Sequence, residues 1–320
     1  MVAMILDVVI PTRDRPDLLA ATLRALGRQD DIDFGVIVVD DGGSPPATDV
    51  AGQSSSVRFL RNDVSIGPGL SRNRGVEASD ARFVVFLDDD CVADPQLIGR
   101  HRAALASADD PVVSLGPILA APGRRLPVWT HWDADRLQRE YVRIANGQSV
   151  ADWTHFYTGN AGVRREDFLA AGGFDGRFAR QEDVELGYRL ARLGCRFVFD
   201  PRAVVVHDSD RSLRSWLRIP AASARFDVLM DQLDPDSARL SNIHSSLSTR
   251  HWALRAARRL VRTPAVRRCA VTGAVAAGRG LHAVRADRAA LSAFSLVWDL
   301  TYWSALRDAA TAGEPIGAPG

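Results

Sequence analysis

The stretch ARFVVFLDDDCVADP, residues 81–95, decides the fold. Five apolar residues, 83–87, run directly into three acids, Asp88, Asp89 and Asp90. A short apolar run bounded by polar residues is typical of a buried strand. Neighbouring carboxylates repel one another, and each one that loses water costs on the order of several kcal/mol unless a cation pairs with it. The stretch therefore predicts a buried strand whose carboxyl end collects positive charge.

Strand and helix patterns alternate in the first third of the chain. Apolar runs that predict strands occupy 5–12, 34–43 and 56–63, and helical patterns occupy 15–29 and 67–79. Continuous apolar strands separated by helices indicate a parallel sheet that is covered on both faces. We therefore expect an α/β fold with a mostly parallel central sheet, in which ligands bind beyond the carboxyl ends of the strands.

Polar residues follow three of these predicted strands at that edge. They are 11–14 (Pro-Thr-Arg-Asp), 40–42 (Asp-Asp-Gly) and 88–90. Carboxylate oxygens are the ligands that hard divalent cations such as Mg²⁺ and Mn²⁺ prefer. Asp-Gly-Gly is also strong turn chemistry, and acids can lie in solvated loops, so each motif alone has a structural explanation. Their common placement favours a metal site.

The middle third adds further candidate groups. Glu182 and Asp183 lie in the first turn of a predicted helix, where acids complement the helix dipole; a carboxylate held beside an electrophile can also act as a general base. His207 ends an apolar strand next to an acid; a single histidine is usually structural, but this position beside the acid-rich strand ends is also consistent with metal ligation. Gly159 and Asn160 lie in a predicted loop that suits either a bound molecule or a plain turn.

The last third is helical and basic. Residues 211–320 contain 16 Arg and 8 acids, whereas residues 1–110 contain 11 Arg and 18 acids, and the whole chain carries a net charge of +1. The segment 248–264 is basic and amphipathic, and 288–310 is rich in large apolar residues. An acidic front suits a cation-dependent site, and a basic tail suits an anionic partner.

Composition sets the broad class. The spacing of the three cysteines matches no metal motif, which is typical of reduced thiols in a cytoplasmic protein. We find no signal peptide and no apolar run long enough to span a bilayer. We therefore expect a cytoplasmic protein. Residues 252–262 could contact the anionic inner face of the membrane. Alternatively, the C-terminal helices cover the acceptor site or form a homodimer interface.

Seven motifs in order resemble the inverting family 2 glycosyltransferases. They are VVIPTRDRPDLL, VIVVDDGG, GLSRNRGVEAS, FVVFLDDDC, TGNAGVRREDFLAAGGFD, QEDVELGYRLARLG and VVVHD, within residues 5–210. The resemblance implies a GT-A fold with a helical C-terminal extension. It also implies nucleotide-sugar binding by 1–110, acceptor binding and the catalytic base in 111–210, and a helical basic region over 211–320.

The resemblance also implies residue roles. Donor binding falls to Pro11, Thr12, Asp14, Asp40, Arg72, Asp88 and Asp89. Metal binding falls to Asp90, His207 and Asp88, with Mg²⁺ or Mn²⁺ as the cofactor. Asp183 is the expected catalytic base with Glu182 beside it, and Trp153, Gly159 and Asn160 are expected at the acceptor.

Single-sugar transfer is the expected reaction. The chain lacks the QxxRW-type motif and the membrane helices of processive synthases. We expect a UDP-sugar donor ahead of a dTDP-sugar, and an acceptor that is a small natural product or a cell-envelope glycan, with no nucleic-acid partner. Two alternatives stay open, a sugar nucleotidyltransferase and a non-catalytic nucleotide-sugar-binding protein. The first normally has a glycine-rich loop after its first strand, which 11–17 lacks.

Overall fold

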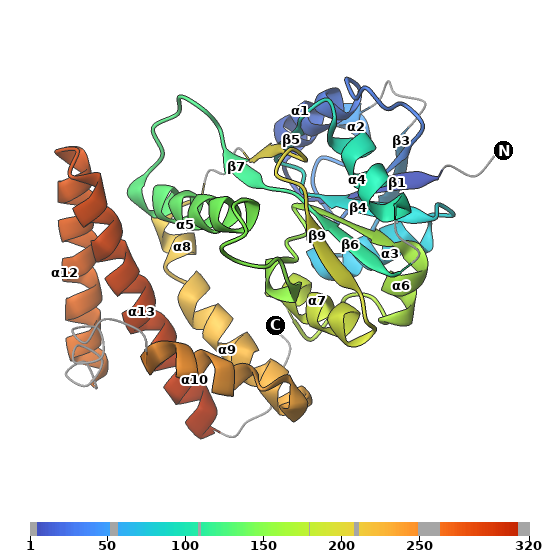
Figure 1. The fold of residues 1–320 in the computed structure, drawn as a ribbon. Helices are drawn as coiled ribbons and strands as arrows, with labels where there is room; N and C mark the ends of the chain where they lie inside the picture. Colours follow the sequence, from blue (N-terminus) through green and yellow to red (C-terminus); the bar gives the residue numbers. More distant parts are fainter. Residues whose placement is uncertain are drawn as a thin grey trace. The chain divides into compact units, whose positions relative to one another are not determined.

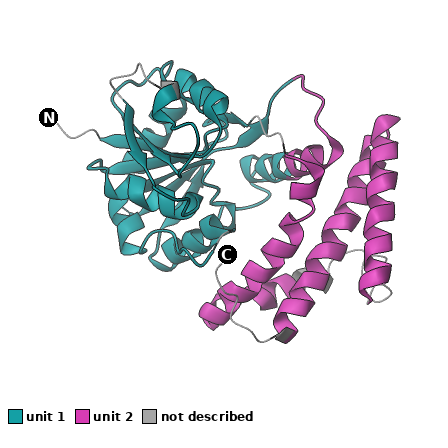
Figure 2. Cartoon of the chain, turned by 180° about the vertical axis from the view of Figure 1, so that it is seen from behind, with its two compact units in different colours: residues 1–122, 137–209 teal, residues 123–136, 210–320 magenta. Residues whose placement is uncertain are grey.

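The computed structural model describes residues 5–51, 57–107, 110–178, 180–207, 211–248 and 263–312. The chain forms two compact units, drawn in different colours in Figure 2. Unit 1 comprises residues 1–122 and 137–209, and unit 2 comprises residues 123–136 and 210–320. The sequence analysis does not anticipate that 123–136 belongs with the C-terminal region, and the roles that it assigns to 1–110 and 111–210 stay predictions.

Unit 1 is built on a seven-stranded sheet (Figure 1). The strand order is β3 (Val57–Arg61), β2 (Gly35–Asp40), β1 (Leu6–Thr12), β4 (Phe83–Leu87), β8 (Asn160–Arg164), β6 (Val112–Leu115) and β9 (Arg196–Phe199). The first four strands are mutually parallel, and β8 runs antiparallel to both of its neighbours. The prediction of a mostly parallel α/β sheet is confirmed.

Helices cover both faces of this sheet because alternate strand residues are apolar on both sides. Val8 and Ile10 of β1 pack with α1 (Pro16–Leu26) and α4 (Leu97–Ala106). Val9 faces the opposite layer, which contains α3 (Pro68–Glu77), α6 (Arg165–Ala170) and α7 (Glu182–Arg192). The five apolar residues that precede Asp88 are fully buried between the two layers.

A small second sheet lies at the end of β4 and controls the site. Its order is β5 (Cys91–Ala93), β10 (Val205–His207) and β7 (Ile118–Ala120). β10 pairs antiparallel with β5, and His207 lies opposite Cys91. Since Cys91 directly follows the three acids, this register brings His207 to the carboxyl end of β4.

Unit 2 is helical. Its residues belong to α5 (Val128–Ala145, up to residue 136), α8 (Leu213–Trp216), α9 (Ile219–Leu233), α10 (Arg239–Ser248), α12 (Pro264–Ala283) and α13 (Asp287–Ala312). Trp132 stacks on Trp298 with ring centroids 4.9 Å apart, and Phe294 and Val297 are fully buried in the same cluster. The helical C-terminal extension is therefore confirmed.

Two expectations about the C-terminal region have different outcomes. The basic segment 252–262 lies outside the described residues, so membrane contact stays a prediction. The large apolar residues that favoured a dimer interface, Phe294, Val297, Trp298 and Trp303, pack into the core of unit 2 itself. A homodimer therefore stays a prediction without their support. None of the described helices combines the length and the apolarity that crossing a membrane requires.

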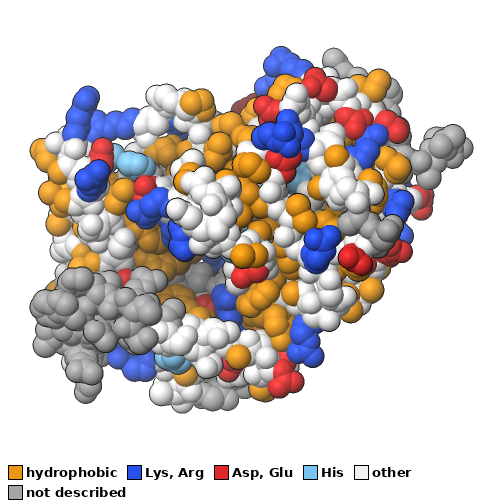
Figure 3. Space-filling view, viewed as in Figure 1, with side chains coloured by type: hydrophobic (Ala, Val, Ile, Leu, Met, Phe, Trp, Pro, Cys, Tyr) orange, Lys and Arg blue, Asp and Glu red, His pale blue; other side chains and the backbone are white. Residues whose placement is uncertain are grey.

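The charge asymmetry of the sequence also appears on the surface. On the face drawn in Figure 3, most acidic side chains lie over the α/β unit, whereas arginines are spread over both units.

The closest approach of α3 to the sheet depends on Gly75. A β-carbon at this position would lie 2.4 Å from a γ-carbon of Val9. Gly75→Ala is therefore expected to lower the free energy of unfolding of unit 1 by about 1–3 kcal/mol in urea denaturation, because overpacking displaces α3. Gly99→Ala, in α4, is the matched control, because the nearest atom would lie 3.8 Å away. It should be neutral or stabilising by up to about 1 kcal/mol, and equal destabilisation by both variants would contradict the prediction.

Candidate active site

The three acids after β4 face different partners. Asp89 and Asp90 are 5% and 8% exposed, and Asp88 is the most accessible of the three. Asp89 accepts a hydrogen bond from the Thr12 hydroxyl at the end of β1, 2.8 Å away. Asp88 turns instead toward Arg72 of α3, 2.5 Å away. Neighbouring acids of the triplet thus contact different elements, with Asp89 bonded to the end of β1 and Asp88 to α3.

Positive charge collects around the triplet, as the repulsion argument predicts. Arg15, half-exposed at the start of α1, contacts both Asp89 (3.2 Å) and Asp90 (3.0 Å) through one guanidinium nitrogen. Burial raises the pKa of Asp89, and the Thr12 hydrogen bond and Arg15 only partly oppose this effect. Burial also favours the protonated form of Asp90, but His207 and Arg15 outweigh it and the pKa of Asp90 is lowered.

Asp90 and His207 form the strongest candidate for a metal site. Oδ1 of Asp90 lies 3.0 Å from Nε2 of His207. Within the described residues, this buried oxygen has no well-aligned hydrogen bond. A buried carboxylate oxygen whose nearest polar neighbour is an imidazole nitrogen 3.0 Å away fits a divalent cation, which can take few protein ligands and complete its shell with phosphate oxygens and water. The sequence-predicted ligands Asp90 and His207 are therefore adjacent, whereas Asp88 contacts Arg72.

Arg72 connects the acidic triplet to the predicted base. This guanidinium is almost fully buried, and it contacts Asp88 on one side and Glu182 at 3.4 Å on the other. It also lies over the ring of Phe174, with 5.7 Å from the guanidinium carbon to the ring centroid. One buried cation thus holds the carboxyl end of β4 and the start of α7 close to each other.

The pKa of Asp183 is raised far above that of an ordinary carboxyl group. Burial and the neighbouring charge of Glu182 raise its pKa to about 7, and only the Val184 amide and more distant arginines oppose the shift. The preceding residue but one, Gln181, adopts a left-handed backbone conformation with φ of 58°. Such strain persists only where surrounding contacts impose it.

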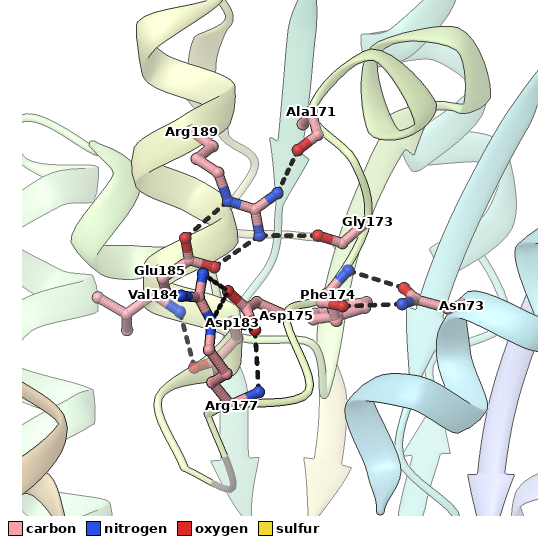
Figure 4. A network of polar contacts seen from close by, with 10 residues as sticks. All are labelled: Asn73, Ala171, Gly173, Phe174, Asp175, Arg177, Asp183, Val184, Glu185 and Arg189. Atoms are coloured by element: carbon pink, nitrogen blue, oxygen red, sulfur yellow. Dashed lines mark hydrogen bonds and ion pairs between the residues drawn. The ribbon is translucent and has the colours of Figure 1, made fainter. Parts of the chain in front are cut away.

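A polar network holds the start of α7 in place (Figure 4). Glu185 makes two hydrogen bonds of 2.6 Å with Arg189, and Arg189 also donates to the carbonyls of Ala171 and Gly173. Asn73 of α3 brackets Phe174 by donating to its carbonyl and accepting from its amide. The 171–177 loop is therefore tied to both α3 and α7.

Several predicted donor-binding residues shape the wall of the site. Both oxygens of Asp40 are used by the chain itself, through the amides of Gly43 and Ala47 and the side chain of Arg61. Asp14 caps the amide of Ser44 and is otherwise exposed. Pro11 is buried in β1 opposite Val39. Their contacts with a donor stay predictions.

The predicted acceptor residues occupy two separate environments. Gly159 lies against the acidic triplet, since a β-carbon there would be 3.2 Å from Oδ2 of Asp88. Asn160 is 1% exposed, and its side chain bonds to His101 and to the carbonyls of Pro117 and Ala203. Trp153 packs edge-on against Tyr188 of α7, with ring centroids 5.3 Å apart. An acceptor contact by any of the three stays a prediction.

Sequence reasoning missed Arg15, and it marked Asp41 only as part of the Asp-Asp-Gly strand end without assigning it a task of its own. Arg15 is one of three arginines or acids in a row, and nothing in RDRPD distinguishes it from Arg13. Asp41 accepts four hydrogen bonds, from Asn62, Ser65 and the amides of Ile66 and Gly67, which outweigh its burial and lower its pKa. Asp41 thereby builds the loop that leads into α3 and Arg72.

The comparisons with known proteins agree with this geometry. In open α/β sheets, ligands bind beyond the carboxyl ends of the strands, which is where the acidic triplet lies. The family model "Glycosyl transferase family 2" matches residues 7–170, just over half of the chain. The chain therefore belongs to glycosyl transferase family 2.

Two curated relatives cover part of the chain. The pre-mycofactocin glycosyltransferase of Mycobacterium tuberculosis is 33% identical over 223 residues, which are 66% of this chain and 44% of that protein. The validoxylamine A glucosyltransferase of Streptomyces hygroscopicus is 30% identical over 215 residues, which are 58% of this chain and 51% of that protein. The chain thus spans about half the length of the curated relatives that it matches.

Two solved structures share the fold. The mannosyltransferase PcManGT from Pyrobaculum calidifontis, in complex with GDP-Man and Mn²⁺, matches 98% of this chain and 77% of its own at a TM-score of 0.56 and 17% identity. S. aureus TarS 1-349 in complex with UDP matches 98% and 93% at a TM-score of 0.54 and 16% identity. The GT-A type of fold is therefore confirmed.

Arg15 neutralises part of the negative charge of the acidic triplet. Arg15→Gln is expected to lower the melting temperature of the metal-free protein by a few degrees, which corresponds to about 1 kcal/mol, because Asp89 and Asp90 lose their shared cation. Added Mn²⁺ should narrow the difference, since the ion neutralises the same carboxylates. Arg13→Gln, equally exposed and beside Asp14, is the matched control. Equal losses in both variants, or no narrowing with Mn²⁺, would show that Arg15 has no such role.

The raised pKa of Asp183 has a consequence for stability. The folded pKa of about 7 lies above the ordinary value of 3.8, so the stability cost of ionising Asp183 begins above the unfolded pKa and is complete once the pH passes about 7. Asp183→Asn should therefore increase the free energy of unfolding, and by more at pH 8 than at pH 5. Asp17→Asn, an exposed first-turn acid of α1, is the control and should give no gain. A gain that is larger at pH 5 would contradict the assignment.

Proposed function

We propose that this chain is an inverting, metal-dependent glycosyltransferase that transfers one sugar from a nucleoside-diphosphate sugar to an acceptor hydroxyl. The observation that carries the proposal is the connection through Arg72. This buried cation joins the acidic end of β4 to the start of α7, where Asp183 has a pKa of about 7. A cation-binding pole and a proton acceptor thus share one rigid site.

Each group has a defined task in this mechanism. Asp90 and His207 would hold the divalent ion, with Asp88 and Asp89 as further anionic groups of the same strand end. When bound, the ion supplies positive charge to the diphosphate leaving group. Asp183 takes the proton from the acceptor hydroxyl as its oxygen attacks the anomeric carbon from the face opposite the leaving group. A single displacement of this kind inverts the configuration.

Different neighbours give the two buried carboxylates opposite tasks, because His207 and Arg15 oppose the effect of burial on Asp90 whereas Glu182 adds to it on Asp183. Asp90 has a lowered pKa and stays anionic beside His207, whereas Asp183 has a raised pKa and can both accept and release a proton near neutral pH. Pairs of titratable groups whose environments separate their pKa values in this way commonly divide the tasks of a reaction.

The donor and the acceptor are proposed from the relatives. A UDP-sugar is the proposed donor, with a dTDP-sugar as the second candidate. The structure of S. aureus TarS in complex with UDP supports uracil as the nucleobase of the donor. The GDP-Man complex of PcManGT makes a GDP-sugar a third arm of the test. Two relatives are named for pre-mycofactocin and for validoxylamine A, and these names favour a natural-product acceptor over a cell-envelope glycan.

Incubation of the purified chain with a panel of UDP-, dTDP- and GDP-sugars tests the reaction class. Release of free nucleoside diphosphate that needs Mg²⁺ or Mn²⁺ and stops with a chelator is expected. Release of pyrophosphate from a nucleoside triphosphate and a sugar phosphate would instead establish a nucleotidyltransferase. Donor binding without turnover on any acceptor would favour a non-catalytic binding protein.

The pH dependence of turnover tests Asp183 separately. Since the base works only when deprotonated, kcat/KM should rise with pH and level off above an apparent pKa near 7. Asp183→Asn should lower kcat by at least about 100-fold and leave donor affinity, measured by calorimetry, within a few-fold of the wild type. Asp17→Asn should leave both values unchanged. Full activity in Asp183→Asn would remove Asp183 from the mechanism.

A further inference from the structure

Unit 2 contains a second cluster of metal-ligating side chains. His131 of α5, His282 in the last turn of α12 and Asp287 in the first turn of α13 each offer one ligand atom, and these atoms lie within 4.8 Å of one another. All three residues belong to unit 2 and are partly buried. Figure 3 shows histidine, acidic and arginine side chains gathered at the end of unit 2 where the α12–α13 turn lies.

Two members of this cluster have a structural explanation that needs no ion. His282 lies at a helix C-terminus and Asp287 at a helix N-terminus, and each complements the dipole of its own helix. Nδ1 of His282 and Oδ1 of Asp287 are 2.8 Å apart, which closes the turn between α12 and α13. This pair alone would therefore carry no further inference.

His131 has no such explanation. It comes from a helix more than a hundred residues earlier in the chain, yet its ring centroid lies 6.1 Å from that of His282, with 57° between the planes. Across the described part of the chain, its ring has no hydrogen-bond or ion-pair partner. A polar ring turned toward a histidine–carboxylate pair, without a partner of its own, is what a third ligand looks like before an ion binds.

The backbone around the cluster is held by contacts that do not involve the three ligands' side chains. Arg125 donates to the carbonyl of His282 at 2.8 Å, and the Trp132 indole donates to the Ser295 hydroxyl at 2.8 Å. These contacts fasten the segment before α5 and α5 itself to α12 and α13. The backbone segments that carry the ligands are therefore held together before any ion arrives, which limits the entropy lost on binding.

We propose that His131, His282 and Asp287 form a Zn²⁺ site that clamps α5 to the α12–α13 turn. Two imidazoles and a carboxylate are the donor set of many zinc sites, with water as the fourth ligand. Ligand atoms about 2.0–2.1 Å from zinc lie roughly 3.3 Å apart on a tetrahedron. The present ligand atoms, within 4.8 Å of one another, must therefore move closer when the ion binds. On binding, the ion takes the place of the proton shared by His282 and Asp287, which passes to solvent.

The surroundings favour zinc over a hard cation. Imidazole nitrogen suits zinc and other borderline metals, whereas Mg²⁺ and Mn²⁺ prefer sites rich in carboxylate oxygen. The cluster supplies a single carboxylate, and Arg125 and Arg285 lie next to His282 in space or in sequence. The nearby arginines repel any bound cation. Coordinate bonds from two imidazoles to zinc are strong enough to overcome this repulsion, whereas the weaker bonds of a hard cation to imidazole are not.

Zinc titration of the full chain, stripped with a chelator and dialysed, tests the proposal. The Asp90→Asn variant provides a background in which the active-site cluster is weakened. We expect both the wild type and Asp90→Asn to retain about one equivalent of Zn²⁺ at unit 2, measured by elemental analysis, with a rise in melting temperature. His131→Gln and Asp287→Asn, each on the Asp90→Asn background, should bind Zn²⁺ at least about tenfold more weakly and lose that rise.

The matched control is His244→Gln, since His244 also packs beside an aromatic ring in unit 2 but lies outside the cluster. It should bind Zn²⁺ as the wild type does. Circular dichroism checks that each variant is folded. If His131→Gln is not folded, the comparison is made with Asp287→Asn instead. Co²⁺ should show tetrahedral d–d absorption that His131→Gln abolishes. Unchanged zinc affinity in the folded variants, or loss of all tight zinc binding in Asp90→Asn alone, would overturn the proposal.

Discussion

The site in unit 1 depends on how the chain places three consecutive carboxylates at the end of a buried strand. Mutual repulsion destabilises such a triplet by itself, and the fold places two arginines and a histidine against it from three different elements. Arg15 comes from α1, Arg72 from α3 and His207 from β10. Each of these contacts also fixes the element that carries it, so charge neutralisation and tertiary assembly are the same set of interactions.

This constraint explains why the small sheet exists. β5 follows the acids at once, and its antiparallel pairing with β10 determines which residue lies beside Asp90. A shift of one residue in that pairing would turn His207 to the opposite face, because side chains alternate along a strand. Asn160 stabilises this arrangement, since its side-chain amide donates a hydrogen bond to the carbonyl of Ala203, just before β10.

The sequence predicts the sheet well because its signal is local. The run 83–87 is apolar throughout and is fully buried, and Gly194, with φ of 86°, follows α7 closely, as its position after the apolar face predicts. The adjacency of Asp90 and His207 could be anticipated only through the family resemblance, because no local pattern links residues so far apart. Asp41 is marked by its strand-end position but not by its four hydrogen bonds, and the contacts of Arg15 could not be anticipated, since they depend on which loops meet in space. The same holds for His131, whose neighbours come from the other end of the chain.

The raised proton affinity of Asp183 bears on what happens after a transfer is complete. With a pKa of about 7, the protonated and ionised forms of Asp183 have nearly the same free energy at neutral pH. If Asp183 is the base, the captured proton can leave to water without help from a second residue, and the carboxylate is restored for the next acceptor. A carboxylate of ordinary acidity would release the proton faster but remove it from a hydroxyl less effectively, so the buried position of α7 sets a compromise between reloading and reaction.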